Sequence, residues 1–101
     1  MHEQDQVAAF LDRHEMDTTL AYHVLDLQSE VGEVAKEVTT STDYGARPSE
    51  AAVADDELGD AFFSLLAVAE AADVDLADAL DAAIAKYESR IAAEGDAGSG
   101  V

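Results

Sequence analysis

Cysteine and tryptophan are absent from the 101-residue chain, and proline occurs only once. Without cysteine, the protein has no disulfides, no thiolate nucleophile and no cysteine-ligated zinc. The aromatic residues are three Phe and three Tyr, whereas apolar residues make up 49% of the chain, many of them alanine. Because alanine favours helices and has a small side chain, we expect a single helical domain with a core of small residues.

Basic residues are scarce, with five Lys and Arg against 23 Asp and Glu and a formal net charge of −18. Nucleic acids and anionic membranes bind clustered Lys and Arg, so this balance argues against both as partners. The excess of acid indicates adaptation to a salty cytoplasm, as in halophilic proteins, where salt screens the repulsion between carboxylates. The composition leaves open an acidic protein with a basic partner.

No apolar run is long enough for a membrane span, and the acidic first residues do not resemble a signal peptide. We therefore expect a soluble cytoplasmic protein. Residues 1–94 should form one domain, and residues 95–101 should form a flexible tail because they lack apolar periodicity. Oligomerisation would let so small a domain bury more surface.

Apolar residues that recur at steps of three and four predict four helices. The third is apolar around most of its circumference, which predicts a central position. Asp17 or Thr18 would cap the second helix, and Asp75 would cap the fourth. The expected helices span about residues 4–15, 18–38, 49–72 and 75–91, and the one sizeable loop, which contains the only proline, spans residues 39–49.

Two of the expected helices contain a pair of acids three residues apart with a glycine just before the second acid. The motifs are Glu-Val-Gly-Glu at residues 30–33 and Glu-Leu-Gly-Asp at residues 57–60. Six acidic pairs with this spacing occur in the chain, so the spacing alone says little. A glycine inside a helix costs roughly 1 kcal/mol relative to alanine. Gly32 and Gly59 therefore indicate either a close approach of two helices or room for a ligand.

The acids of these motifs flank the apolar seams of the second and third helices. Glu30, Glu33 and Glu37 follow an i, i+3, i+7 spacing, which places them on one stripe. If the seams pack together, this stripe meets Glu57 and Asp60 at the edge of the contact. Such carboxylates repel one another, and a divalent cation removes the conflict. An all-oxygen site suits Mg²⁺, with Mn²⁺ as a substitute. The alternative is a solvated acidic face.

Lys86 and Arg90 lie one turn apart on the last expected helix, in a chain with only five basic residues. They could bind phosphate oxygens, or they could only balance charge near a helix C-terminus. No Glu precedes a His by three residues, so the signature of carboxylate-bridged di-iron bundles is missing. The residues therefore favour metal-assisted phosphate chemistry over redox chemistry.

The order of these motifs resembles that of the MazG-like nucleoside triphosphate pyrophosphohydrolases. An ExxE at residues 30–33 is followed by about two dozen residues, an ExxD at residues 57–60 and a trailing basic helix, and the resemblance spans about residues 20–90. It implies an all-α, four-helix bundle-like fold packed in a homo-oligomer, either a dimer or a tetramer. Two departures concern the substrate: Tyr87 stands where family members often have Asn, and a Trp often seen near the base pocket is absent.

The resemblance also implies roles for the acidic and basic residues. The expected reaction is Mg²⁺-dependent hydrolysis of a nucleoside or deoxynucleoside triphosphate between the α and β phosphates, giving monophosphate and pyrophosphate. Glu33 or Glu37 would orient the attacking water. The alternatives are a non-catalytic acidic dimerisation or regulatory module, and a pyrophosphohydrolase of another metabolite such as phosphoribosyl-ATP. The implied metal ligands are Glu30, Glu33, Glu57 and Asp60, and the implied triphosphate contacts are Lys86 and Arg90.

Overall fold

The structure, a computed structural model, describes residues 1–95. Within this range the chain forms helices and no strand, so the prediction of an all-α protein is confirmed. None of the described helices combines the length and the apolarity needed to cross a membrane. The elements are α1 (His2–Arg13), α2 (Leu20–Ser41), the short 3₁₀ helix η1 (Pro48–Glu50), α3 (Asp55–Ala71) and α4 (Leu76–Glu94).

Side-chain caps set the start of two helices. The Asp75 carboxylate accepts hydrogen bonds from the backbone N–H groups of Ala77 and Asp78, at 2.9 and 3.2 Å, and so caps α4 as predicted. At α2 the predicted cap, Asp17 or Thr18, was wrong by one or two positions. The cap is Thr19, whose hydroxyl oxygen accepts from the backbone N–H of Tyr22.

Helix α3 begins at Asp55, six residues later than the predicted start near residue 49. Residues 48–50 form the separate helix η1, and the backbone N–H groups that follow it bond to α2. The N–H of Ala52 donates to Ser41 Oγ at 2.9 Å, and the N–H of Ala54 donates to Glu37 Oε1. These bonds to α2 hold residues 51–54 out of the helix, which no local pattern in the sequence could indicate.

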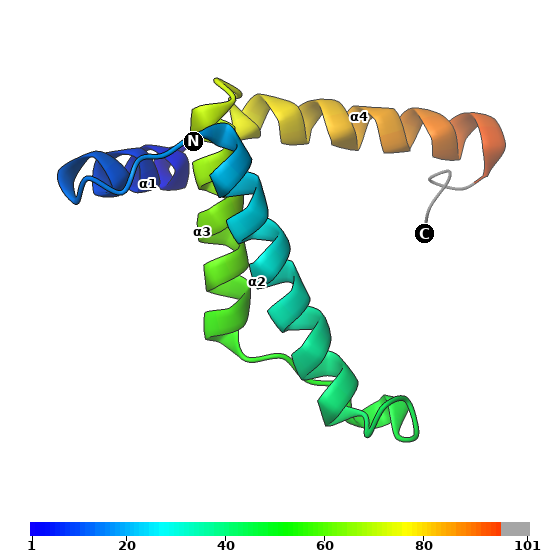
Figure 1. The fold of residues 1–101 in the computed structure, drawn as a ribbon. Helices are drawn as coiled ribbons and strands as arrows, with labels where there is room; N and C mark the ends of the chain where they lie inside the picture. Colours follow the sequence, from blue (N-terminus) through cyan, green and yellow to red (C-terminus); the bar gives the residue numbers. More distant parts are fainter. Residues whose placement is uncertain (96–101) are drawn as a thin grey trace.

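Figure 1 shows α2 and α3 side by side and antiparallel, as a helical hairpin. Helix α1 packs against α3 at the end of this hairpin where α4 begins. Helix α3 packs on both α1 and α2, which confirms its predicted central position. Helix α4 extends away from the other helices (Figure 1). One chain therefore forms a three-helix core with a projecting fourth helix. The expected bundle-like packing in a homo-oligomer stays a prediction, since within one copy only the start of α4, at Leu76, packs against the core.

The hydrophobic core of the described residues is small and lies between α1 and α3. The buried side chains include Val7 and Leu11 of α1 and Leu66 and Ala67 of α3, with Phe63 packed against them. The Phe10 ring contacts the edge of the Phe63 ring, with centroids 5.7 Å apart. Most of the other large apolar side chains remain substantially exposed, so a single copy leaves much of its apolar surface in water.

The buried side chain of Gln4 connects α1 to the turn between α3 and α4. Its amide nitrogen donates to Glu70 Oε2 at 2.8 Å and to the Val74 carbonyl at 2.7 Å. Its amide oxygen accepts from the backbone N–H of Leu76 at 2.9 Å. One side chain thus pairs polar groups from the end of α3, the turn and the first residue of α4, and it sets the direction in which α4 leaves.

Glycine ends α4. Gly95 has a positive φ of 83°, a left-handed conformation that glycine adopts without steric cost, and its N–H bonds to the Ile91 carbonyl. The tail predicted for residues 95–101 lies, apart from Gly95, outside the described residues.

Replacing Gln4 with Ala should lower the free energy of unfolding by about 1–3 kcal/mol, because the Val74 carbonyl, the Leu76 N–H and the Glu70 carboxylate lose the partner that they share. The matched control is Gln6→Ala, on the same helix but exposed, which should change stability little. Chemical denaturation followed by circular dichroism measures both. Equal stability of the two variants would show that Gln4 does not connect these elements.

Candidate metal centre

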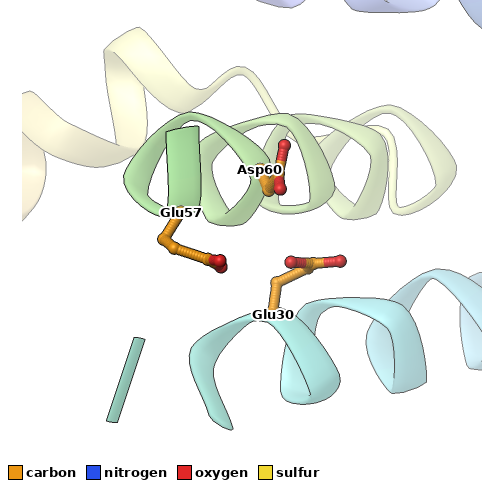
Figure 2. Close-up of side chains that lie close together, drawn as sticks. All are labelled: Glu30, Glu57 and Asp60. Carbon is orange, nitrogen blue, oxygen red and sulfur yellow. The ribbon is translucent and has the colours of Figure 1, made fainter. Parts of the chain in front are cut away.

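Helices α2 and α3 bring three carboxylates together at the edge of their contact. Glu30 comes from α2, and Glu57 and Asp60 come from α3, where the three-residue spacing places them on one side of the helix. One carboxylate oxygen from each side chain lies within 4.8 Å of the other two. Figure 2 shows Glu30 and Glu57 reaching toward each other across the gap between the helices, with Asp60 one turn along α3.

The ionised Glu57 carboxylate is disfavoured by its surroundings. Lost hydration raises the pKa of the Glu57 carboxyl above its ordinary value of 4.5, and repulsion from Asp56, Glu37, Glu33 and Asp60 raises it further. A raised folded-state pKa means that the folded protein holds the proton more tightly than the unfolded chain does. Stability contributed by protonated Glu57 is therefore lost as the pH rises above about 4.5 through the folded-state pKa.

The fourth predicted ligand, Glu33, lies outside the group of three. Its exposed side chain borders a shallow depression of about 190 Å³ with Lys36, Glu37 and Thr40, one turn farther along α2. Glu33 still contributes to the field at Glu57. Glu37 has a structural task, because its carboxylate accepts the hydrogen bond from the N–H of Ala54 at the start of α3.

The two motif glycines do not mark a close approach of helices within the chain. A Cβ atom built on Gly32 or on Gly59 meets no other atom within 4 Å. Of the two explanations that the sequence left open, a close approach of two helices is absent from the described chain, and open space beside each glycine is present. Glycine lowers the stability of both helices, and no contact within the chain compensates for this loss.

A depression of about 320 Å³ adjoins the cluster on its other side. Glu30 and Asp60 form part of its wall. The sequence interpretation missed this depression, although Asp26 lies one turn before Glu30 on the same face of α2 and the spacing could have indicated it. The remaining lining residues are Asp26, Ser29, Phe63 and Ser64.

Lys86 and Arg90, the predicted phosphate contacts, lie on α4, which extends away from the α2–α3 hairpin (Figure 1). The Lys86 Nζ atom lies 4.9 Å from the centroid of the neighbouring Tyr87 ring. Arg90 is partly buried along the helix. Neither side chain belongs to the carboxylate cluster of its own chain.

The donor set fits a hard divalent cation. Three carboxylates supply only oxygen, which Mg²⁺ and Mn²⁺ prefer. Oxygens on opposite sides of one Mg²⁺ lie about 4.2 Å apart, since each bond is about 2.1 Å long. Because Glu30, Glu57 and Asp60 are all at least partly exposed, small side-chain rotations would suffice to close the present spacing of up to 4.8 Å.

A family model described as the MazG nucleotide pyrophosphohydrolase domain matches residues 18–92. The chain belongs to this family. The match covers α2, α3 and nearly all of α4, including both glycine motifs, and it leaves α1 outside. A search of curated proteins and a search of solved structures each found no significant match. The MazG family is typically metal-dependent, in agreement with a carboxylate cluster between α2 and α3.

Replacing Glu57 with Gln should raise the melting temperature of the metal-free MazG domain, because the amide removes one of the repelling charges. The same variant should lose most of the rise in melting temperature that MgCl₂ produces at fixed ionic strength. Glu88→Gln, on the exposed surface of α4, removes the same charge away from the cluster and serves as control. The repulsion argument fails if Glu57→Gln melts below wild type without metal.

Replacing Gly32 with Ala should stabilise the metal-free protein by about 1 kcal/mol, because alanine is the better helix former and its Cβ meets no neighbour. Gly45→Ala is the comparison, since Gly45 has a φ of 91° that alanine adopts only with strain, and it should destabilise. Urea denaturation gives both values. A destabilised Gly32→Ala variant would mean that another molecule approaches α2 at this point.

Proposed function

We propose that this MazG-family protein is a Mg²⁺-dependent nucleoside triphosphate pyrophosphohydrolase. It adds water to a nucleoside or deoxynucleoside triphosphate and releases monophosphate and pyrophosphate. The observation that carries the proposal is the convergence of Glu30, Glu57 and Asp60, three carboxylate ligands from two helices, at one point. The match to a nucleotide pyrophosphohydrolase domain supports the reaction class.

Glu30, Glu57 and Asp60 would hold the ion, with Glu33 joining them by a change of rotamer from the next turn of α2. A bound Mg²⁺ supplies Lewis-acid polarisation of phosphoryl oxygens and a more acidic water. Helix α2 and helix α3 keep these ligands in register because Glu37 is bonded to the backbone at the start of α3.

Glu33 is the better of the two carboxylates proposed to orient the attacking water. Its carboxylate is exposed beside the cluster, whereas the Glu37 carboxylate is already engaged by the N–H of Ala54. If one oxygen of Glu33 joins the ion, the other oxygen would still be able to accept the proton that the attacking water gives up.

The nucleoside would occupy the depression next to Glu30 and Asp60. Its volume of about 320 Å³ is at the lower end of the range for small-molecule sites. The hydroxyls of Ser29 and Ser64 and the carboxylate of Asp26 offer hydrogen bonds to a sugar or a base.

Lys86 and Arg90 remain the proposed contacts to the triphosphate, whose charge they would offset. The functional form is proposed to be a dimer or a tetramer. Because α4 extends away from its own hairpin, these two cations would serve the carboxylate cluster of another copy (Figure 1).

Pyrophosphate release from a panel of ribo- and deoxynucleoside triphosphates, with and without Mg²⁺ and at low and high salt, tests the proposal. Glu57→Gln and Glu33→Gln should each lower the rate by more than about 100-fold, because even residues that only support metal ligands contribute about 10–100-fold. Glu88→Gln should retain wild-type activity.

Two results would overturn the proposal. One is full activity with Mg²⁺ in folded Glu33→Gln and Glu57→Gln variants. The other is the absence of turnover of every triphosphate by a folded wild-type protein. Including phosphoribosyl-ATP in the panel separates a pyrophosphohydrolase of that substrate from a protein that turns over nothing.

A further inference from the structure

Helix α1, which lies against α3 (Figure 1), places an aromatic ring against the wall of the depression that adjoins the carboxylate cluster. Phe63 of α3 lines this depression together with Glu30 and Asp60. On the side of α1, the Phe63 ring meets the Phe10 ring, with centroids 5.7 Å apart and ring planes at 89°. Because α1 lies outside the residues that match the family, that match gives Phe10 no role.

Phe63 is the one apolar side chain among the described residues that line this depression, and the others carry carboxylates or hydroxyls. The ring is half-buried, so part of it remains accessible from the depression. Every purine and pyrimidine has a flat π-face, and bases stack on aromatic side chains whatever hydrogen-bonding groups they carry. Phe63 is therefore the side chain of this wall on which a nucleobase would stack.

The Phe63 ring borders open space on two sides. Besides the depression toward α2, it lines a second depression, of about 220 Å³, between α1 and α3. Gly59 also lines the second depression and adds no side chain to it. A change of rotamer can therefore turn the ring away from the carboxylate cluster. The contacts that oppose this change come from α1, namely the Phe10 ring and the buried side chains of Val7 and Leu11.

Phe10 is itself held by its own helix. The His14 ring lies one turn further along α1, with its centroid 4.5 Å from that of Phe10. The guanidinium carbon of Arg13 lies 5.8 Å from the centroid of the Phe10 ring. Contacts of both kinds have preferred geometries, so they restrict the Phe10 ring more than apolar burial alone would. A restricted Phe10 ring can in turn restrict Phe63.

We infer that Phe10 is a positioning residue for the nucleobase. It touches no ligand itself, and it acts by holding the Phe63 ring in the rotamer on which a base stacks. Phe10 thereby favours ligands that carry a purine or a pyrimidine over pyrophosphate, which has no base. The inference rests on the proposed function for the place of the nucleoside, but its test is a binding measurement that requires no turnover.

Fluorine NMR of the full chain tests whether a base reaches Phe63. The chain has three phenylalanines, so 4-fluorophenylalanine should give three ¹⁹F resonances, which single Phe→Leu variants assign. Addition of AMP, CMP, GMP or UMP with Mg²⁺ should shift the Phe63 resonance. Pyrophosphate with Mg²⁺ should shift it much less. Phe62 lies outside the wall of the nucleoside depression, so its resonance is the internal control.

Phe10→Leu should raise the dissociation constant of the tightest-binding monophosphate by about threefold to tenfold, the range for loss of an aromatic pair. The constant for pyrophosphate should stay within about twofold. Phe10→Tyr keeps the ring and should bind the monophosphate as wild type does. Phe62→Leu removes a neighbouring ring and should change neither constant. If a triphosphate is turned over, Phe10→Leu should raise its KM and change kcat by less than about twofold.

A double-mutant cycle separates positioning from a general loss of stability. Phe63→Leu should itself weaken binding of the monophosphate by roughly fivefold to a hundredfold. In that background, Phe10→Leu should cost no more than about twofold further, because the ring through which it acts is gone. Phe10→Met fills the space with a flexible side chain and replaces Phe10→Leu if the latter does not melt cooperatively.

Three results overturn the inference: a Phe63 resonance that no monophosphate moves, equal weakening of monophosphate and pyrophosphate by Phe10→Leu, and a Phe10→Leu effect that persists without Phe63. Triphosphate turnover with an unmoved Phe63 resonance would overturn the inference and leave the proposed function standing. A base-dependent shift that Phe10→Leu weakens, without turnover of any triphosphate, would support the inference and overturn the proposed reaction.

Discussion

The antiparallel contact of α2 with α3 is the interaction on which the rest of the structure depends. It sets Glu30 opposite Glu57 and Asp60, and it creates the only place among the described residues where three carboxylates converge within 4.8 Å. The contact is maintained at the loop end by hydrogen bonds from Ala52 and Ala54 to side chains of α2. Both bonds join the segment just before α3 to α2. They therefore also help to fix the positions of the carboxylates of α3 relative to Glu30 of α2.

The carboxylate cluster and the glycines of its motifs both lower the stability of the metal-free protein. Lost hydration and repulsion from neighbouring carboxylates raise the pKa of Glu57, so the stability that its protonated form contributes is lost as the pH rises through that pKa. The glycines in the two motifs add a second cost, because neither fills space in its own chain and alanine would be the better helix former.

The hydrophobic core of one copy is small, and the projecting helix α4 adds little to it. Burial within one copy is concentrated where α1 crosses α3, and Leu66 and Ala67 are among the few side chains that are almost fully enclosed there. Much of the remaining apolar area is exposed, including Leu80, Ile84 and Ile91 of α4. In the proposed dimer or tetramer, part of this area would be buried between copies, and the net charge of −18 would make that association sensitive to salt.

The sequence by itself determined the helices, the cap at Asp75 and the two acidic motifs, because apolar period, capping and i, i+3 spacing are local properties that neighbouring residues express. The resemblance in motif order also indicated the family correctly. Only the tertiary structure decided three other features. It selected Glu30 rather than Glu33 to meet Glu57 and Asp60. It delayed the start of α3 through bonds to α2. It aimed α4 outward through Gln4, which bonds to a residue 72 positions away. These features depend on groups that are distant in the chain and adjacent only after folding, so no local pattern encodes them.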